Sequence, residues 1–139
     1  MHVLLINGSP HEKGCTYTAL SLVAGELNAA GITTEILNVG TKPVGGCIGC
    51  GGCAKGNGCV FGGVVNEAIE KARTADAFVF GTPVHYASAS GNMTSFLDRL
   101  AYAGGKYLAY KPAAICCSAR RAGTTSTLDQ LVKYPQFFH

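Results

Sequence analysis

A short apolar run that breaks into a glycine-containing turn and then a helical pattern constrains this chain more than any other feature. Residues 3–6 are predicted to form a strand buried on both faces, and Gly8, Ser9 and Pro10 end it. From Thr16 onward, apolar side chains recur at helical spacing. A strand-to-helix turn of this kind directs free backbone N–H groups and the positive end of the helix dipole toward one place, which suits a phosphate group.

The side chains of this turn narrow the choice of phosphate ligand. Donors are available from Ser9, Cys15, Thr16 and Tyr17, and positive charge from His11 and Lys13. The Walker A motif is absent, because it requires Gly-Lys-Ser/Thr and here Cys15 stands between Gly14 and Thr16 in place of the lysine. The G-x-G-x-x-G dinucleotide pattern is absent as well. The turn therefore favours a phosphate monoester over a nucleoside triphosphate, and a turn that only connects strand and helix is the alternative.

Length, charge and cysteine content set outer bounds on function. The 139 residues are predicted to form one domain, residues 1–139, with 47% hydrophobic and 14% charged residues. The eleven Lys and Arg residues are scattered and the net charge is +3, which argues against a nucleic-acid surface. An export signal and an apolar run long enough for a membrane span are both missing, so we expect no membrane partner and a cytoplasmic location, with the seven cysteines reduced or metal-bound.

Strands and helices alternate along the rest of the chain. We expect strands at residues 34–39, 77–80 and 113–118, and helices that end near Ala30 or cover residues 65–72 and 93–100. A last helix is expected near Ser126 and Asp129, which have capping-box spacing. Gly31 is suited to a left-handed helix cap, and Cys116 and Cys117 to core positions. This alternation predicts a parallel sheet covered by helices on both faces.

Ligands of such sheets bind at the carboxyl ends of the strands. Three connections start there: the turn after the first strand, the loop at residues 81–92, and the loop at residues 118–123. We expect these three loops to converge on one crevice. Donors for a phosphate, an aromatic loop with small residues and an arginine pair would then meet, which is the layout required for a phosphorylated planar ring.

Four segments of the chain, taken in order, resemble a known family. NGSPHEKGCTYTAL, CIGCGGCAKGNGCV, GTPVHYASASGNMTSFLDRL and SARRAGTT are together similar to the flavodoxin-like NADPH-dependent FMN reductases, and among these to the branch that includes iron–sulfur flavoproteins. The resemblance implies a flavodoxin-like doubly wound parallel sheet of order 2-1-3-4, FMN as cofactor and a homodimer. It also implies a fifth strand and another helix after residue 139, so the C-terminus is short relative to the family.

The resemblance also assigns site residues. It places the FMN phosphate at Ser9, His11, Cys15, Thr16 and Tyr17, the flavin ring at Pro83, Val84, His85, Tyr86, Ala87 and Ser88, and the third loop at Ser118, Arg120, Arg121 and Gly123. His11 and Cys15 stand where the family often has arginine and asparagine. Because hydride is accepted at flavin N5, no catalytic side chain is assigned, and Arg120 or Arg121 is expected to stabilise the negative charge of reduced flavin.

The stretch at residues 40–63 holds ten glycines and four cysteines and is predicted to be a long loop. Its cysteines, Cys47, Cys50, Cys53 and Cys59, have the spacing C-x2-C-x2-C-x5-C. This compact spacing favours a [4Fe–4S] cluster over zinc, which is usually bound by two separated cysteine pairs. A loop of free thiols without metal is the other alternative.

Three functional hypotheses follow. The first is an FMN-dependent NAD(P)H oxidoreductase that reduces a small acceptor such as a quinone, an azo compound or free flavin. The second is an iron–sulfur flavoprotein that carries electrons to a redox partner protein. The third is a flavin-free degenerate or regulatory module.

Overall fold

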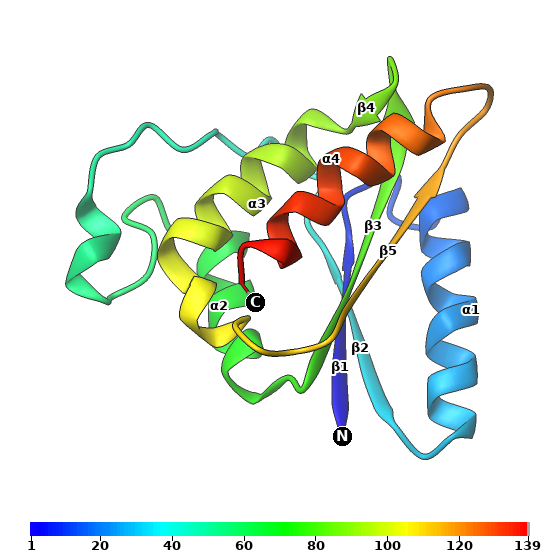
Figure 1. Ribbon diagram of the computed structural model, residues 1–139, viewed down its shortest axis with the longest axis horizontal. Helices are drawn as coiled ribbons and strands as arrows, with labels where there is room; N and C mark the ends of the chain where they lie inside the picture. The colour runs from blue at the N-terminus through cyan, green and yellow to red at the C-terminus, as the bar shows by residue number, and fades with distance from the viewer. Residues whose placement is uncertain (139) are drawn as a thin grey trace.

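Four parallel strands form the centre of the molecule. The computed structural model describes residues 1–138, with strand order β2-β1-β3-β5 and every neighbouring pair in this order parallel (Figure 1). The elements in chain order are β1 (His2–Asn7), α1 (Cys15–Ala29), β2 (Thr33–Asn38), the 3-10 turn η1 (Gly52–Lys55), α2 (Val64–Thr74), β3 (Ala77–His85), β4 (Ser88–Ala89), α3 (Gly91–Gly104), the 3-10 turn η2 (Gly105–Tyr107), β5 (Ala113–Ser118) and α4 (Thr124–Gln136).

The strand order confirms the prediction, because the fourth strand expected from the sequence is β5. The addition is β4, a two-residue strand that pairs antiparallel with the end of β3. Two residues are too few to show the alternating pattern by which a strand is recognised in a sequence. Gly31 has the expected left-handed conformation after α1, with φ of +78°.

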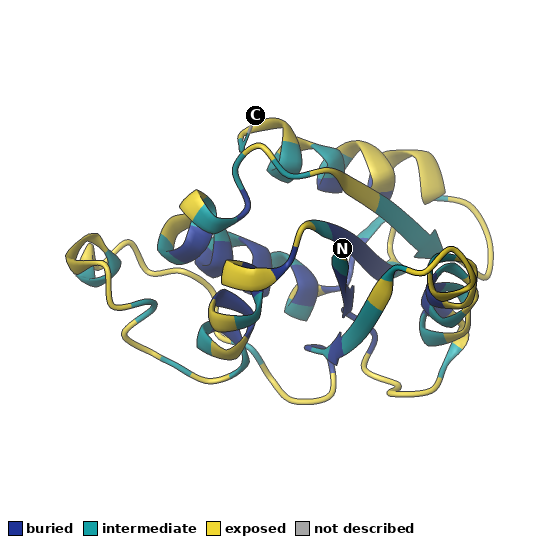
Figure 2. Ribbon diagram, turned by 90° about the horizontal axis from the view of Figure 1, so that it is seen from below, coloured by how far each residue is buried: buried dark blue, intermediate teal, exposed yellow. Residues whose placement is uncertain are grey.

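Helices cover both faces of the sheet, as predicted. On one face, Val3, Leu5 and Val79 pack against Leu20 and Ala24 of α1. On the other face, the alternate side chains of β1 and β3 pack against α2, α3 and α4, in a cluster that includes Leu4, Ile6, Phe78, Phe80, Ile69, Phe96, Leu97 and Leu131. The two central strands, β1 and β3, are accordingly deeply buried, the outer strands β2 and β5 are mostly half-buried, and the segment between β2 and α2 is largely exposed (Figure 2).

The predicted capping box at Ser126 and Asp129 is wrong. The helix α4 begins at Thr124, directly after its N-cap Gly123, whose φ is +102°, so the cap lies three residues earlier than expected. The Asp129 carboxylate accepts a hydrogen bond from Lys133 Nζ at 3.0 Å instead of capping the helix. The Ser126 hydroxyl contacts the Gly123 carbonyl at 3.1 Å and the Ala87 carbonyl at 2.8 Å.

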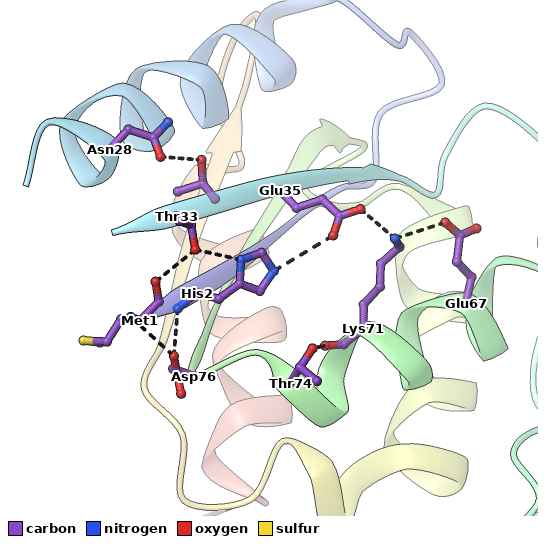
Figure 3. A network of polar contacts seen from close by, with 10 residues as sticks. Met1, His2, Asn28, Thr33, Glu35, Glu67, Lys71, Thr74 and Asp76 are labelled. Carbon is purple, nitrogen blue, oxygen red and sulfur yellow. Dashed lines mark hydrogen bonds and ion pairs between the residues drawn. The ribbon is translucent and has the colours of Figure 1, made fainter. Parts of the chain in front are cut away.

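A polar network joins the amino ends of β1 and β2 to α2 (Figure 3). Lys71 Nζ lies 2.6 Å from a Glu35 carboxylate oxygen and 3.7 Å from Glu67, and His2 N donates to Asp76 at 2.7 Å. The hydrogen bond to Glu35 raises the pKa of Lys71. Since these side chains are partly exposed, the network orients the elements more than it stabilises them. Every helix within residues 1–138 is too short or too polar to cross a lipid bilayer.

The core and this network are expected to differ sharply in their contribution to stability. Phe80 is 1% exposed, so Phe80→Ala should lower the free energy of unfolding by about 3–5 kcal/mol. Lys71→Met should lower it by about 1 kcal/mol or less. Because the pKa of Lys71 is raised in the folded state, its contribution is present below its unfolded pKa of about 10.4 and is lost at higher pH. Urea unfolding at pH 7 and pH 11 measures both effects. If Lys71→Met lowered the free energy of unfolding more at pH 11 than at pH 7, the raised pKa of Lys71 in the folded protein would be contradicted.

Candidate functional site

The register of the sheet brings three chain connections to one edge. Asn7 of β1 lies opposite Gly81 of β3, and Gly81 lies opposite Cys116 of β5. The strands are parallel, so the turn after β1, the end of β3 and the loop after β5 all leave from this edge. The side chains of Thr16 and Ser118, 102 residues apart in sequence, share a hydrogen bond of 2.8 Å. The first and third loops are therefore in direct contact.

The turn after β1 is shaped by a buried polar network. The Asn7 side chain is fully buried, and it accepts from Ser9 N at 3.1 Å and donates to Asn38 Oδ1 at 2.8 Å. Ser90, at the start of α3, donates its hydroxyl proton to the Gly8 carbonyl at 2.7 Å. Within the turn, Ser9 Oγ accepts from His11 N at 3.1 Å. These bonds fix the turn from β2, from α3 and from within.

The turn also needs a glycine that lies far away in sequence. A Cβ atom at Gly40 would lie 2.3 Å from the Ser9 carbonyl oxygen, so only glycine fits there. The sequence prediction missed Asn7, Gly40 and Ser90. Asn7 carried a recognisable signal, since it is an amide at the end of an otherwise apolar strand, whereas the roles of Gly40 and Ser90 depend on contacts between elements distant in sequence.

A hollow of about 420 Å³ lies between the first turn and the other two loops. It is lined by Ser9, His11, Gly14, Cys15, Thr16, Pro83, Val84, His85, Ser118, Ala119 and Arg120. The helix α1 begins at its wall, after Gly14, which brings no capping side chain. The first N–H groups of a helix have no partner within the helix, so they and the helix dipole are available to an anion here.

A second hollow of about 570 Å³ adjoins the first and shares Val84, His85, Ala119 and Arg120 with it. Its other lining residues are Tyr86, Ala87, Arg121 and Ala122. The Tyr86 side chain is fully exposed at the tip of the turn between β3 and β4. The two hollows together offer hydrogen-bond donors at one end and small, aromatic and cationic side chains at the other, which suits a planar ring that carries a phosphate.

Three of the residues assigned to this site from the sequence do not line either hollow. Tyr17 is half-buried on α1, past the wall of the first hollow. Ser88 donates its hydroxyl proton to Gln130 Oε1 at 2.9 Å, so its side chain contacts α4. Gly123 packs against the backbone of Ala87, where a Cβ atom would lie 2.7 Å from Ala87 Cα. Ser88 and Gly123 therefore support the turn between β3 and β4 from behind.

The cysteine loop forms a separate hollow. Cys47, Cys50, Cys53 and Cys59 all line one space of about 580 Å³, on the side of α3 that carries Asp98, Arg99 and Tyr102. Arg99 is 6% exposed; its Nε atom donates to Cys59 Sγ at 3.2 Å and its Nη2 atom to the Gly62 carbonyl at 2.9 Å. Within residues 1–138, no three side chains of the metal-binding types lie close enough together to hold a metal ion.

The loop is, as predicted, mostly irregular, with a single short 3-10 turn at Gly52–Lys55. It extends beyond α2 and α3, on the opposite side of the molecule from α1 (Figure 1). The arrangement therefore separates the cysteine hollow from the hollows at the start of α1.

Comparisons with known proteins agree with this geometry. The model of the NADPH-dependent FMN reductase family matches residues 1–138. An iron-sulfur flavoprotein of Archaeoglobus fulgidus is 33% identical over 99 residues, which make up 71% of this chain and 48% of that protein. An iron-sulfur flavoprotein of Methanocaldococcus jannaschii is 30% identical over 99 residues, 71% of this chain and 51% of that protein. The chain thus spans about half the length of these curated relatives.

Solved structures show the same fold. An archaeal flavodoxin superposes with a TM-score of 0.68 at 12% identity, covering 99% of this chain and 75% of the flavodoxin. The apo form of an NADH:FMN oxidoreductase gives a TM-score of 0.71 at 19% identity, covering 99% of this chain and 68% of that chain. These matches establish the flavodoxin-like architecture expected from the sequence.

The environments of the cysteines predict different reactivities. Burial raises the pKa of Cys116, with a smaller contribution from the neighbouring Cys117, and burial also raises the pKa of Cys117. Cys15, Cys47 and Cys50 are exposed. Because the thiolate is the reactive form, iodoacetamide at pH 8 should label these three residues at least about tenfold faster than Cys116 and Cys117. Peptide mass spectrometry at several times measures the rates, and rapid labelling of Cys116 in the folded protein would contradict the structure of β5.

Proposed function

The chain belongs to the NADPH-dependent FMN reductase family, and from this premise we propose that it binds FMN at the carboxyl edge of its sheet and passes electrons from NAD(P)H to a small acceptor, such as a quinone, an azo compound or free flavin. The observation that carries the proposal is the meeting of three loops around two adjoining hollows, with an open helix N-terminus at one end. Bound FMN would supply the chemistry, because its ring accepts hydride and releases electrons singly or in pairs.

Different residues would hold the phosphate and the ring of this cofactor. In the first hollow, the N–H groups that open α1 and the side chains of Ser9 and Thr16 would hold the phosphate. In the second, the turn between β3 and β4 would form a wall beside the ring. Arg120 and Arg121 line this second hollow and carry positive charge. They would favour the anionic form of a reduced ring, since opposite charge nearby stabilises an anion.

The energy of binding shows why both hollows are needed. A micromolar cofactor requires a binding free energy of about 8 kcal/mol. A helix N-terminus contributes at most about 2 kcal/mol to binding an anion. Hydrogen bonds in the phosphate hollow and burial of the ring must supply the rest. A chain with only the first hollow would bind phosphate esters weakly and without preference for a flavin.

A second function is favoured by one observation. All four cysteines of the loop line a single hollow beside the buried Arg99, and the curated relatives described above are named iron-sulfur flavoproteins. A [4Fe–4S] cluster would make the protein an electron carrier to a redox partner protein. The thiols are not gathered at one point, so metal would have to order the loop as it binds, which is usual for sites formed by flexible segments.

The setting of the proposed reaction rests on two arguments: the family resemblance suggests a homodimer, and the composition and charge of the chain suggest the location and the kind of partner. We propose that the protein acts in the cytoplasm as a homodimer, with a small-molecule acceptor or a redox protein as its partner and without nucleic acid or membrane. A flavin-free regulatory module is the competing hypothesis. It predicts a colourless protein even after incubation with FMN.

A negative charge introduced into the first hollow tests FMN binding. His11 is exposed and lines the hollow, so His11→Glu should leave the fold intact and place a negative charge beside the phosphate. We expect FMN to bind at least about tenfold more weakly, because like charges a few ångströms apart repel by more than about 1 kcal/mol even near a protein surface. Quenching of flavin fluorescence on titration measures the dissociation constant.

Lys13→Glu is the matched control. Lys13 is exposed in the same turn and does not line the hollow, yet its reversal changes the net charge by two units where His11→Glu changes it by one. A local phosphate site predicts the larger loss for His11→Glu. A larger loss of FMN affinity for Lys13→Glu would mean that the overall charge, and not a phosphate site beside His11, determines binding. A wild-type protein that binds no FMN would overturn the proposed function.

The cysteine hollow is tested separately. After anaerobic reconstitution with iron and sulfide, the wild-type protein should carry iron and Cys50→Ser should lose most of it, while both bind FMN equally. Cys117→Ser, in β5, is the control and should retain its iron. If the iron content is unchanged by Cys50→Ser, or if the wild-type protein takes up no iron, the proposed cluster is contradicted.

A further inference from the structure

The turn between β3 and β4 has an unusual backbone. His85 and Ser88 are paired across the antiparallel strands, and the two residues between them, Tyr86 and Ala87, have φ of 50° and 60°. Hairpins with two residues in this left-handed conformation normally use Asn-Gly or Gly-Gly, because a Cβ atom makes the conformation unfavourable. Backbone strain of this kind persists only where the surroundings enforce it.

Two side chains of α4 supply this enforcement. Gln130 Oε1 accepts two hydrogen bonds, one from Ser88 Oγ at 2.9 Å and one from Ala89 N at 3.0 Å. Ser126 Oγ donates to the Ala87 carbonyl at 2.8 Å. The turn and the short strand after it are thus hydrogen-bonded to a helix that starts more than thirty residues later in the chain.

The start of α4 adds a steric limit. A Cβ atom at Gly123 would lie 2.7 Å from Ala87 Cα and 3.0 Å from Val84 Cγ1, so the helix begins directly against the turn. Gly123 itself has φ of +102°, which a glycine adopts readily. The turn is therefore confined by contact with Gly123 and by hydrogen bonds to Gln130 and Ser126.

We propose that Gln130 and Ser126 are positioning residues, which hold the Tyr86–Ala87 turn in its strained shape so that the ring-binding half of the FMN site exists before the cofactor arrives. The inference rests on the proposed function, because the same turn lines the second hollow through Val84, His85, Tyr86 and Ala87. A wall that is already ordered costs less conformational entropy on binding than one that must be ordered by the ligand.

The test uses two replacements of Gln130. Because a single atom, Oε1, accepts both hydrogen bonds, Gln130→Glu keeps an acceptor for both of them, whereas Gln130→Met keeps the length of the side chain and removes the acceptor. Ser126→Ala removes the third hydrogen bond. Asp129→Ala, on an exposed position of the same helix, is the control for effects on α4 itself.

Two readouts separate this inference from the proposed function. The hydrogen bonds that join Gln130 and Ser126 to the turn and β4 are called the clamp. Hydrogen exchange at the Ala89 amide, measured by NMR without FMN, reports the clamp directly, since that amide donates to Gln130. Titration with FMN reports its consequence for the site. We expect Gln130→Met to speed exchange at Ala89 and weaken FMN binding by about tenfold, Ser126→Ala to weaken it by several-fold, and Gln130→Glu and Asp129→Ala to stay within about twofold of wild type.

The inference is overturned if Gln130→Met has the same exchange rate at Ala89 and the same FMN affinity as the wild type. It is also overturned if Gln130→Glu loses as much FMN affinity as Gln130→Met. If Gln130→Met does not fold, Ser126→Ala decides the question by the same two readouts. A wild-type protein that binds no FMN overturns the proposed function and the role of the clamp in it, whereas the exchange at Ala89 still decides whether the clamp holds the turn.

Discussion

The parallel register of β1, β3 and β5 is the constraint on which the rest of the structure depends. Since the three strands run in the same direction, Asn7, Gly81 and Cys116 lie side by side, and the chain leaves the sheet three times at one edge. The hydrogen bond between Thr16 and Ser118 joins the first and third of these exits. Apolar side chains on both faces of the strands hold the register, because a shift by one residue would exchange the faces that pack on α1 and on α3.

The two ends of the candidate site are made rigid in different ways. The phosphate end is held by buried polar groups, of which Asn7 and Ser90 satisfy backbone groups that water cannot reach. The ring end is an exposed turn in an unfavourable conformation, held from behind by α4. An exposed wall can contact a second substrate, whereas a buried one cannot. This division is consistent with a cofactor that is anchored by its phosphate and reacts at its ring.

Much of the fold follows from local patterns in the sequence. The parallel sheet and the coverage of both its faces could be predicted because four apolar runs alternate with helical patterns, and the loops of the site because each follows such a run, whereas the strand order came from the family resemblance. The supports of those loops could not be predicted. Gly40 matters through its approach to Ser9, and Gln130 through contacts with Ser88 and Ala89, neither of which leaves a local pattern. The capping-box prediction for Ser126 was wrong for a different reason, because the helix already begins at Thr124, after Gly123.

Mapping of FMN contacts by NMR tests the central claim most directly. If three loops form one flavin site, adding FMN to the isotopically labelled protein should shift or broaden the amide signals of residues 9–17, 83–88 and 118–123 together, at one saturating concentration. The signals of residues 45–62, within the cysteine loop, should stay in place. Shifts confined to one of the three segments, or centred on the cysteine loop, would contradict the account.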